Sequence, residues 1–245
     1  EEKKLAILRK AGVKNRPGYD LADEVYFQNT NLSVRVTDDF MERVIGDMFW
    51  DTNFIKTKET CKTYRAKDLL RKIAETSYII GDPGLMFHDT VNKWNTLADD
   101  EDIVSSNPCG EYVSLNNTSC NLASINLMKF FSKDETNNFT FDYGTFEDVI
   151  KTVITAQDIL IDKSSYPSAE IETNSRIYRN LGLGYTNLGG LLMWLGIPYD
   201  SDEGRFVAAG LTALMTGIAY QTSADLADKV GEFAKFEDNK NSFTK

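Results

Sequence analysis

The sequence predicts an α/β fold, because short strand patterns alternate along the chain with longer helical patterns. Leu32, Val34 and Val36 alternate with polar residues, which is typical of a half-buried strand. Helical stripes follow, each with a start or stop signal beside it. The 245 residues contain no internal repeat, low-complexity linker or clear boundary, so we expect residues 1–245 to form a single unit.

Two helices are expected in the first third of the chain. The first begins after Thr37, a helix N-cap, and its opening turn carries Asp38 and Asp39, which favour the positive end of the helix dipole. The second runs from Ala66 to about Ile80. The turn sequence Gly81-Asp82-Pro83-Gly84 ends it.

The rest of the chain predicts a loop, a buried strand and further helices. Residues 107–127 are rich in Asn and contain Pro and Gly, so they are expected to form a loop that leads into a buried strand. A helix is predicted from about Thr145 to Asp162, with Thr145 and Asp148 as a capping box. Residues 181–195 are glycine-rich and then helical. Asp200-Ser201-Asp202 caps a last helix that runs to about Val230 and is stopped by Gly231.

Bulk composition excludes several functional classes. With 27 Lys and Arg against 37 Asp and Glu, the net charge is −10, so no direct nucleic-acid binding is expected. A mononucleotide remains compatible, because a few backbone amides can hold its phosphate. No apolar stretch is long enough for a membrane span. The three cysteines contain no CxxC pair and the N-terminus has no signal peptide, so we expect a cytoplasmic protein.

The residues with the clearest chemical potential lie in the predicted loop. Asn107, Cys109 and Glu111 stand at alternate positions, and in an extended segment all three side chains would point into one cavity. A thiol, a carboxylate and an amide could then act as nucleophile or radical carrier, general base and hydroxyl partner. Cys120 follows eleven residues after Cys109. By spacing alone, two such cysteines are more often inert buried residues.

The sequence around these cysteines resembles the finger loop of ribonucleotide reductases, and most closely the adenosylcobalamin-dependent branch. The resemblance covers nearly the whole chain. It is carried by Ser106-Asn107-Pro108-Cys109-Gly110-Glu111-Tyr112, Ser119-Cys120-Asn121-Leu122-Ala123-Ser124-Ile125-Asn126-Leu127, Gln28-Asn29-Thr30-Asn31-Leu32-Ser33-Val34-Arg35-Val36-Thr37-Asp38, Asn92-Lys93-Trp94-Asn95-Thr96 and Leu181-Gly182-Leu183-Gly184-Tyr185-Thr186-Asn187-Leu188-Gly189. The resemblance implies the central portion of a ten-stranded α/β barrel with an inserted finger loop, without the N-terminal and C-terminal parts of that barrel.

The resemblance also implies a role for each loop residue. Cys109 would carry a thiyl radical that takes the 3′ hydrogen of a ribonucleotide, and Glu111 would take the proton of the 3′ hydroxyl. Asn107 would hold the sugar hydroxyls. Cys120 would be one half of the redox dithiol that is oxidised to a disulfide, with its partner on a strand that this sequence lacks. Cys61 matches no redox cysteine of the family.

Partners and cofactor follow from the same resemblance. The substrate would be a ribonucleoside di- or triphosphate, and an external dithiol would restore the reduced thiols. The remaining segments of the reductase would be needed for turnover, either as split partner chains or in a longer chain. The implied cofactor is adenosylcobalamin. The alternative is a radical from a separate metal-containing small subunit.

Other residues of the chain are compatible with different functions. His88, the only histidine, could form a hydrolase dyad with Cys109, or a zinc site with the three cysteines, but a lone His is more often structural and the spacings are unusual for zinc. Gly182-Leu183-Gly184 lacks the third glycine of a dinucleotide-binding fingerprint and is interpreted as close helix packing. A non-catalytic remnant or assembly subunit of the same fold is the remaining alternative.

Overall fold

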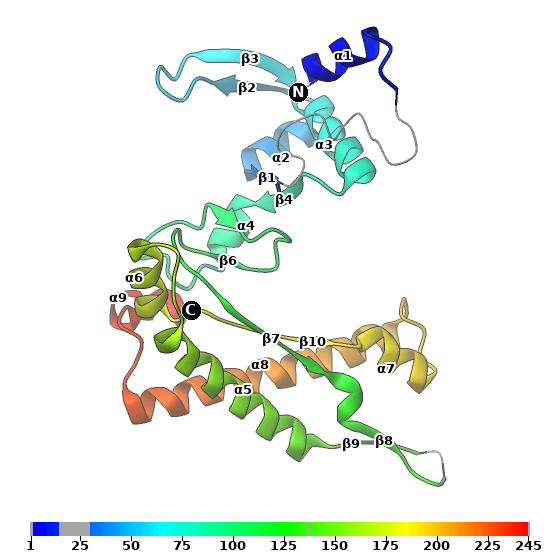
Figure 1. Cartoon of the computed structure of the whole chain (residues 1–245), viewed down its shortest axis with the longest axis vertical. Coiled ribbons are helices and arrows are strands. Elements are labelled where there is room, and N and C mark those ends of the chain that lie inside the picture. The colour runs from blue at the N-terminus through cyan, green and yellow to red at the C-terminus, as the bar shows by residue number, and fades with distance from the viewer. Residues whose placement is uncertain (1, 15–29, 137, 245) are drawn as a thin grey trace. The chain divides into compact units, whose positions relative to one another are not determined.

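The computed structural model describes residues 2–14, 30–136 and 138–244, which form two compact units. The first unit holds residues 1–90 and 106–111, and the second holds residues 91–105 and 112–245. Each unit mixes helices and strands (Figure 1), so the predicted α/β class is confirmed. Every sheet among the described residues has two strands, and those residues close no barrel. That one barrel takes in residues 1–245 stays a prediction.

The first unit is built on a pair of parallel strands. Strand β1 (Ser33–Val36) pairs with β4 (Gly84–Phe87), and the chain between them forms α2 (Asp38–Ile45), the hairpin β2 (Phe49–Asn53) and β3 (Thr60–Arg65), and α3 (Ala66–Ile80). Parallel neighbours need such a crossover, because a tight turn only joins antiparallel strands. Helix α1 (Glu2–Lys10) precedes them, and Gln28-Asn29 of the family-like segment lie outside the described residues.

Local signals explain the helix ends in this unit. The Thr37 hydroxyl accepts a hydrogen bond from the Phe40 amide at 3.3 Å, as expected of an N-cap. Gly81 ends α3 in the left-handed conformation, with φ of 81°, which glycine adopts without a steric penalty. Phe40 is buried and meets Trp50 edge to face, at 5.1 Å between ring centroids. This contact joins α2 to the hairpin.

The second unit contains the larger core. Strands β7 (Asn121–Asn126) and β10 (Leu181–Thr186) pair in parallel, with Asn121 opposite Leu181 and Asn126 opposite Thr186. Helices α5 (Tyr143–Lys163) and α8 (Asp202–Val230) lie along this strand pair (Figure 1). The core between these elements consists of Ile125, Leu127, Phe130, Phe146, Ile150, Ile154, Leu191, Leu211, Met215 and Ile218. Burial of these apolar side chains is the main term that stabilises the unit.

Shorter elements complete the second unit. The 3₁₀ turn η2 (Leu127–Lys129) leads into the hairpin β8 (Phe131–Lys133) and β9 (Phe139–Phe141). Helix α6 (Ala169–Tyr178) precedes β10, and α7 (Leu188–Leu195) follows it. The last helix is α9 (Phe236–Phe243). Strand β6 (Val113–Ser114) also belongs to this unit, whereas α4 (His88–Lys93) and β5 (Ser105–Ser106) each include residues of both units.

The main departure from the predicted elements is at residues 181–186. They form the strand β10, and the helix α7 begins only at Leu188. The interpretation of Gly182 and Gly184 as helix-packing glycines is therefore wrong. The predicted helices after Thr37, from Ala66, near Thr145 and after Ser201 are confirmed.

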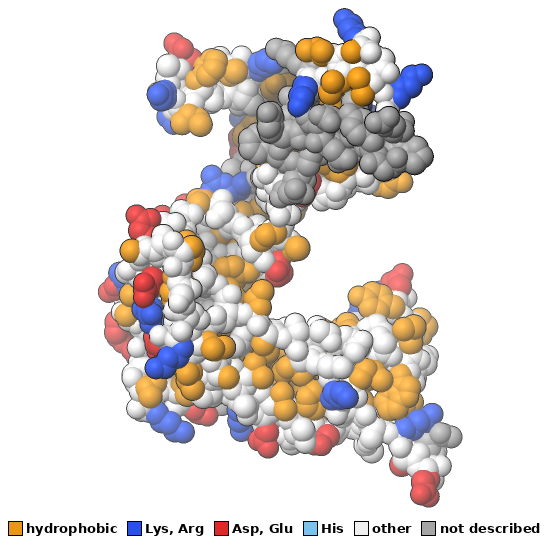
Figure 2. Space-filling model, viewed as in Figure 1, with side chains coloured by type: hydrophobic (Ala, Val, Ile, Leu, Met, Phe, Trp, Pro, Cys, Tyr) orange, Lys and Arg blue, Asp and Glu red, His pale blue; other side chains and the backbone are white. Residues whose placement is uncertain are grey.

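Both units expose large apolar side chains, and Figure 2 shows such side chains on the visible face of each. Tyr78 and Ile79 on α3 are 92% and 76% exposed, and Phe206 on α8 is 79% exposed. Surfaces of this kind commonly mark contacts with other protein segments. In the parts of the chain that are described, no helix combines the length and apolarity that a bilayer span requires.

Candidate active site

The segment with Cys109 forms a tight turn in the first unit. The Gly110 amide donates to the Asn107 carbonyl at 3.2 Å, and Gly110 has φ of 78°. Pro108 and Cys109 are the two central residues of this turn. Asn at the first position, Pro at the second and Gly at the fourth are the residues that such turns favour. The predicted loop is therefore confirmed at residues 107–110, but these residues are not extended, which was the condition for the three side chains to point into one cavity.

The turn removes the sequence-based reason to expect the three loop side chains to point in the same direction. Cys109 and Glu111 are exposed, while Asn107 is half-buried and its carbonyl also accepts from the Ser106 hydroxyl at 3.0 Å. The argument from alternation no longer holds, because residues in a turn do not alternate as in a strand. That Asn107, Cys109 and Glu111 face one substrate stays a prediction, and it rests on the family resemblance.

Cys120 lies in the second unit, directly before β7. Its side chain is half-buried, and its thiol donates to the Asn121 carbonyl at 3.5 Å. The neighbouring strand carries Gly182 opposite Leu122. A methyl group added at Gly182 would lie only 2.8 Å from the Cys120 sulfur. The sulfur therefore occupies space that any larger residue at position 182 would fill.

Hydrogen bonds of hydroxyl and amide groups fix the segment that precedes Cys120. The Ser119 amide and hydroxyl both bond the hydroxyl of the buried Ser175 on α6, at 3.1 and 2.7 Å. The Tyr112 hydroxyl is 3.3 Å from that of Thr118. Burial raises the pKa of Tyr112 above its ordinary value. Tyr112 therefore stays a neutral phenol at physiological pH.

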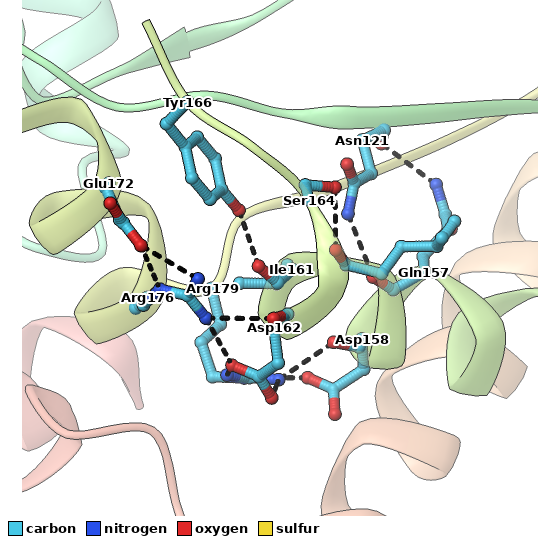
Figure 3. Close-up of polar contacts among 11 residues, drawn as sticks. Asn121, Gln157, Asp158, Ile161, Asp162, Ser164, Tyr166, Glu172, Arg176 and Arg179 are labelled. Atoms are coloured by element: carbon cyan, nitrogen blue, oxygen red, sulfur yellow. Dashed lines mark hydrogen bonds and ion pairs between the residues drawn. The ribbon is translucent and has the colours of Figure 1, made fainter. Parts of the chain in front are cut away.

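Gln157 on α5 joins both strands of the parallel pair. Its side-chain Nε2 donates to the Asn121 carbonyl at 2.9 Å and to the Gly182 carbonyl at 2.8 Å. The Asn121 side chain in turn donates to the Gln157 carbonyl at 2.9 Å (Figure 3). Gln157 is only 3% exposed, so these bonds are shielded from water. They fix the start of β7 and β10 against α5.

An arginine just before β10 adds a second attachment to α5. Arg179 caps α6 in the left-handed conformation, with φ of 50° and ψ of 48°. Its guanidinium donates to the carboxylates of Asp158 and Asp162, at 2.8 and 3.1 Å, and to the Asp158 carbonyl at 2.8 Å (Figure 3). Hydrogen bonds to Asp158 raise the pKa of Arg179, and the bond from Arg179 lowers the pKa of Asp162. The charges on both sides are thereby stabilised.

Comparison with known proteins decides the family. Residues 10–245 match the family described as ribonucleotide reductase, barrel domain. The chain belongs to this family. The family was expected from the loop around Cys109 and Cys120, and that expectation is confirmed.

Three relatives illustrate how similar this ribonucleotide reductase chain is to individual members of the family. A vitamin B12-dependent ribonucleotide reductase of Rhodopirellula baltica is 46% identical over 241 residues, which cover 98% of this chain and 23% of the relative. Its counterpart from Streptomyces clavuligerus is 44% identical over 98% of this chain and 25% of its own length. A vitamin B12-dependent ribonucleoside-diphosphate reductase of Thermoplasma acidophilum is 32% identical over 84% of this chain. The chain thus spans about a quarter of the length of these relatives.

Sequence reasoning missed three residues that the structure places around the start of the parallel strand pair that follows Cys120. Gly182 was assigned to helix packing, and neither Gln157 nor Arg179 was noticed. The glycine in a strand pattern was a usable signal, because glycine there often marks a close approach. A glutamine on the apolar face of α5 was a second signal, since a buried amide needs partners. Nothing local predicts that Arg179 adopts the left-handed conformation.

The structure also bears on a metal site. Within the described residues, no group of three or more His, Cys, Asp or Glu side chains is placed to hold a metal ion. His88 instead lies 3.4 Å from the Arg35 guanidinium, within the first unit. The three cysteines are all described, and none is in a disulfide.

Proposed function

We propose that this chain is the central part of the catalytic subunit of an adenosylcobalamin-dependent ribonucleotide reductase. The observation that carries the proposal is the identity of 44–46% to reductases named as vitamin B12-dependent, over 98% of the chain. The chain keeps the thiol, carboxylate and amide of the finger-loop motif, together with the downstream Cys120. The enzyme would reduce ribonucleoside di- or triphosphates in the cytoplasm.

The proposed chemistry assigns one task to each residue. The Cys109 sulfur radical takes the 3′ hydrogen atom, and Glu111 accepts the 3′ hydroxyl proton. Asn107 binds the sugar hydroxyls without adding a charge. Cys120 and a second thiol, supplied by the remaining segments of the reductase, give two electrons and two protons and join in a disulfide. One proton goes to the 2′ hydroxyl, which leaves as water, and the other goes to the 2′ carbon. Glu111 returns its proton to the 3′ oxygen, and Cys109 returns the hydrogen atom to the 3′ carbon, which restores its radical. An external dithiol then restores both thiols.

The coenzyme has a limited part in this proposal. When bound, adenosylcobalamin supplies the one-electron chemistry that removes the hydrogen atom of the Cys109 thiol. Cys109 lies at the tip of the turn, where a group held by the remaining segments of the reductase could reach it. The task of this chain is to hold that thiol and to exclude water from it once substrate is bound.

The fold we propose for the complete protein is the ten-stranded α/β barrel. Two parallel pairs support it: β1 with β4, and β7 with β10, each joined by helical crossovers. The exposed apolar residues of α3 and α8 support it as well, since other segments of the reductase would cover them. Those segments would be supplied by a longer chain or by split partner chains.

The full-length enzyme that contains this chain provides the test. Deoxyribonucleotide formation is measured with adenosylcobalamin and a dithiol reductant, without any small subunit. We expect activity, its abolition by Cys109→Ala, and no deoxyribonucleotide product in Cys120→Ser, because the remaining thiol alone cannot supply two electrons by forming a disulfide. Cys61→Ser is the matched control, because Cys61 is an exposed thiol on β3, and it should leave activity unchanged.

Three results would contradict the proposal in different ways. Activity in Cys109→Ala would remove the radical role and leave a non-catalytic or assembly function. Activity that appears only with a separate metal-containing subunit would overturn the coenzyme assignment. Deoxyribonucleotide formation in Cys120→Ser would remove that thiol from the redox pair.

A further inference from the structure

The Cys120 sulfur is placed by two neighbours that do not take part in the chemistry. The first is Gly182. A methyl group there would lie 2.8 Å from the Cys120 sulfur and 2.6 Å from Cδ2 of Leu122, closer than side-chain carbons pack. Leu122 is 67% exposed and can move aside, whereas the sulfur can only rotate about one bond. The missing side chain at position 182 therefore decides which rotamer Cys120 can adopt.

The second neighbour is Gln157, which acts through a shared oxygen. The Asn121 carbonyl accepts from the Cys120 thiol at 3.5 Å and from the Gln157 amide at 2.9 Å. The orientation of the amide follows from its surroundings. A flipped Gln157 would set its oxygen against the Asn121 and Gly182 carbonyl oxygens, which repel it. The amide thus fixes the oxygen to which the thiol donates.

We propose that Gly182 and Gln157 are positioning residues for the Cys120 thiol, Gly182 by leaving the space for the sulfur and Gln157 by holding its acceptor. The inference rests on the proposed function in one respect, that Cys120 is a redox thiol. Such a thiol needs accurate placement, because a disulfide joins two sulfurs about 2.05 Å apart within a narrow range of dihedral angles. A misplaced sulfur slows every cycle of oxidation and reduction.

Substitutions at the two positions are expected to change the strength of the hydrogen bond from the Cys120 thiol in opposite directions. Gly182→Ala displaces the sulfur from the Asn121 carbonyl, so the bond weakens or is lost. Gln157→Met fills a similar volume but removes both N–H donors, so the carbonyl serves the thiol alone and the thiol bond strengthens. A purely structural role would loosen the site in both variants and shift the bond in one direction only.

The S–H stretching band in the infrared reports this bond directly. Difference spectra of the full-length enzyme against its Cys120→Ser variant isolate the band of Cys120. We expect a shift to higher frequency in Gly182→Ala and to lower frequency in Gln157→Met. Gly184→Ala is the matched control, two residues along the same strand, because an added methyl there meets no atom of the described residues within 4 Å.

Alkylation by iodoacetamide, resolved by peptide mass spectrometry, gives a second measurement on the same samples. Loss of the thiol bond favours the thiolate, so Cys120 should react about threefold faster or more in Gly182→Ala and more slowly in Gln157→Met. Cys61 is the internal reference and should keep its rate. With the coenzyme and a dithiol present, kcat in Gly182→Ala should fall about tenfold at unchanged KM.

The outcomes separate this inference from the proposed function. Opposite band shifts with an unchanged Gly184→Ala spectrum support the positioning role. An unshifted band in Gly182→Ala, or shifts of both variants in one direction, would overturn it. If Gln157→Met does not fold, the comparison of Gly182→Ala with Gly184→Ala decides alone. Deoxyribonucleotide formation in Cys120→Ser would refute the redox role, and the infrared result would still judge the positioning.

Discussion

The hydrogen bonds of Arg179 to Asp158 and Asp162, called the Arg179 clamp below, allow a stability prediction with several matched variants. Arg179 is 21% exposed, and its partner Asp158 is 27% exposed, so these charges are only partly screened by water. Charge-assisted hydrogen bonds in such places contribute about 1.5–3 kcal/mol, and exposed ion pairs about 0.2–1 kcal/mol. The bonds to Asp158 together with the half-exposed pair to Asp162 lead us to expect a loss of about 3 kcal/mol in Arg179→Ala.

The left-handed backbone conformation of Arg179 makes a second contribution to the free energy of unfolding. Arg179 has φ of 50°, and an L residue there costs about 1 kcal/mol relative to glycine. Arg179→Gly should therefore lose about 2 kcal/mol, less than Arg179→Ala, although both remove the same guanidinium. Arg179→Lys should fall between Arg179→Ala and the unchanged chain, because an ammonium cannot reproduce the fork that bonds both carboxylates.

Urea unfolding followed by far-UV circular dichroism measures these differences, provided that the slope with denaturant stays constant. Arg176→Ala is the control, since Arg176 also bonds Asp162 but its side chain is 34% exposed and its other partner, Glu172, lies one turn away on α6. It should cost about 1 kcal/mol or less. The reasoning is refuted if Arg176→Ala is the more damaging change, or if Arg179→Gly unfolds as easily as Arg179→Ala.

Three further predictions concern the second unit. Phe146→Ala should cost about 4 kcal/mol in the same assay, because Phe146 is fully buried, and a loss below about 2 kcal/mol would contradict this account of the core. Ser201→Ala should cost about 1 kcal/mol, because Ser201 caps α8, whereas Ser201→Thr should be nearly neutral, since its hydroxyl can accept from the Gly204 amide and donate to the Pro198 carbonyl. Burial opposes the charge of Asp100, but hydrogen bonds from Asn239 and Lys235 outweigh it and lower the pKa of Asp100. The stability that the charged Asp100 contributes is present above pH 4 and is lost as the pH falls through the lowered pKa. Amide hydrogen exchange of residues 236–243 should therefore become faster as the pH falls through that range. Asp100→Asn should show the same fast exchange at neutral pH.

Helix ends were the most predictable part of this fold, because their signals are local. Thr37, Gly81 and Ser201 each do in the structure what their residue types favour. The start of α5 was off by a few residues. Its N-cap is Asp142, whose carboxylate accepts from the Thr145 amide at 3.0 Å, whereas the capping box had been placed on Thr145 itself. A neighbouring pair of good capping residues left two starts that the pattern alone does not separate.

The strand pairs were not predictable in the same way. Residues 121–126 and 181–186 pair across a long stretch of intervening chain, and no local pattern states which strands become neighbours. The turn at Asn107-Pro108-Cys109-Gly110 is a different case, because its residue types do favour a turn. A loop was predicted there, but the convergence of Asn107, Cys109 and Glu111 had been argued for extended geometry, which the turn does not have.

Helix α5 connects the stability of the second unit to the placement of its thiol. Gln157 and Asp158 are consecutive on this helix: the first holds the carbonyls of both parallel strands, and the second holds Arg179, two residues before β10 begins. If the strand register depended on Arg179, its loss would shift Gly182 and disturb Cys120. The core residues and the six paired positions of β7 and β10 fix that register independently. We therefore expect Arg179→Ala to lower the free energy of unfolding while the S–H band of Cys120 stays in place, and a shift of that band would show that the clamp, not the strand pair, sets the position of the sulfur.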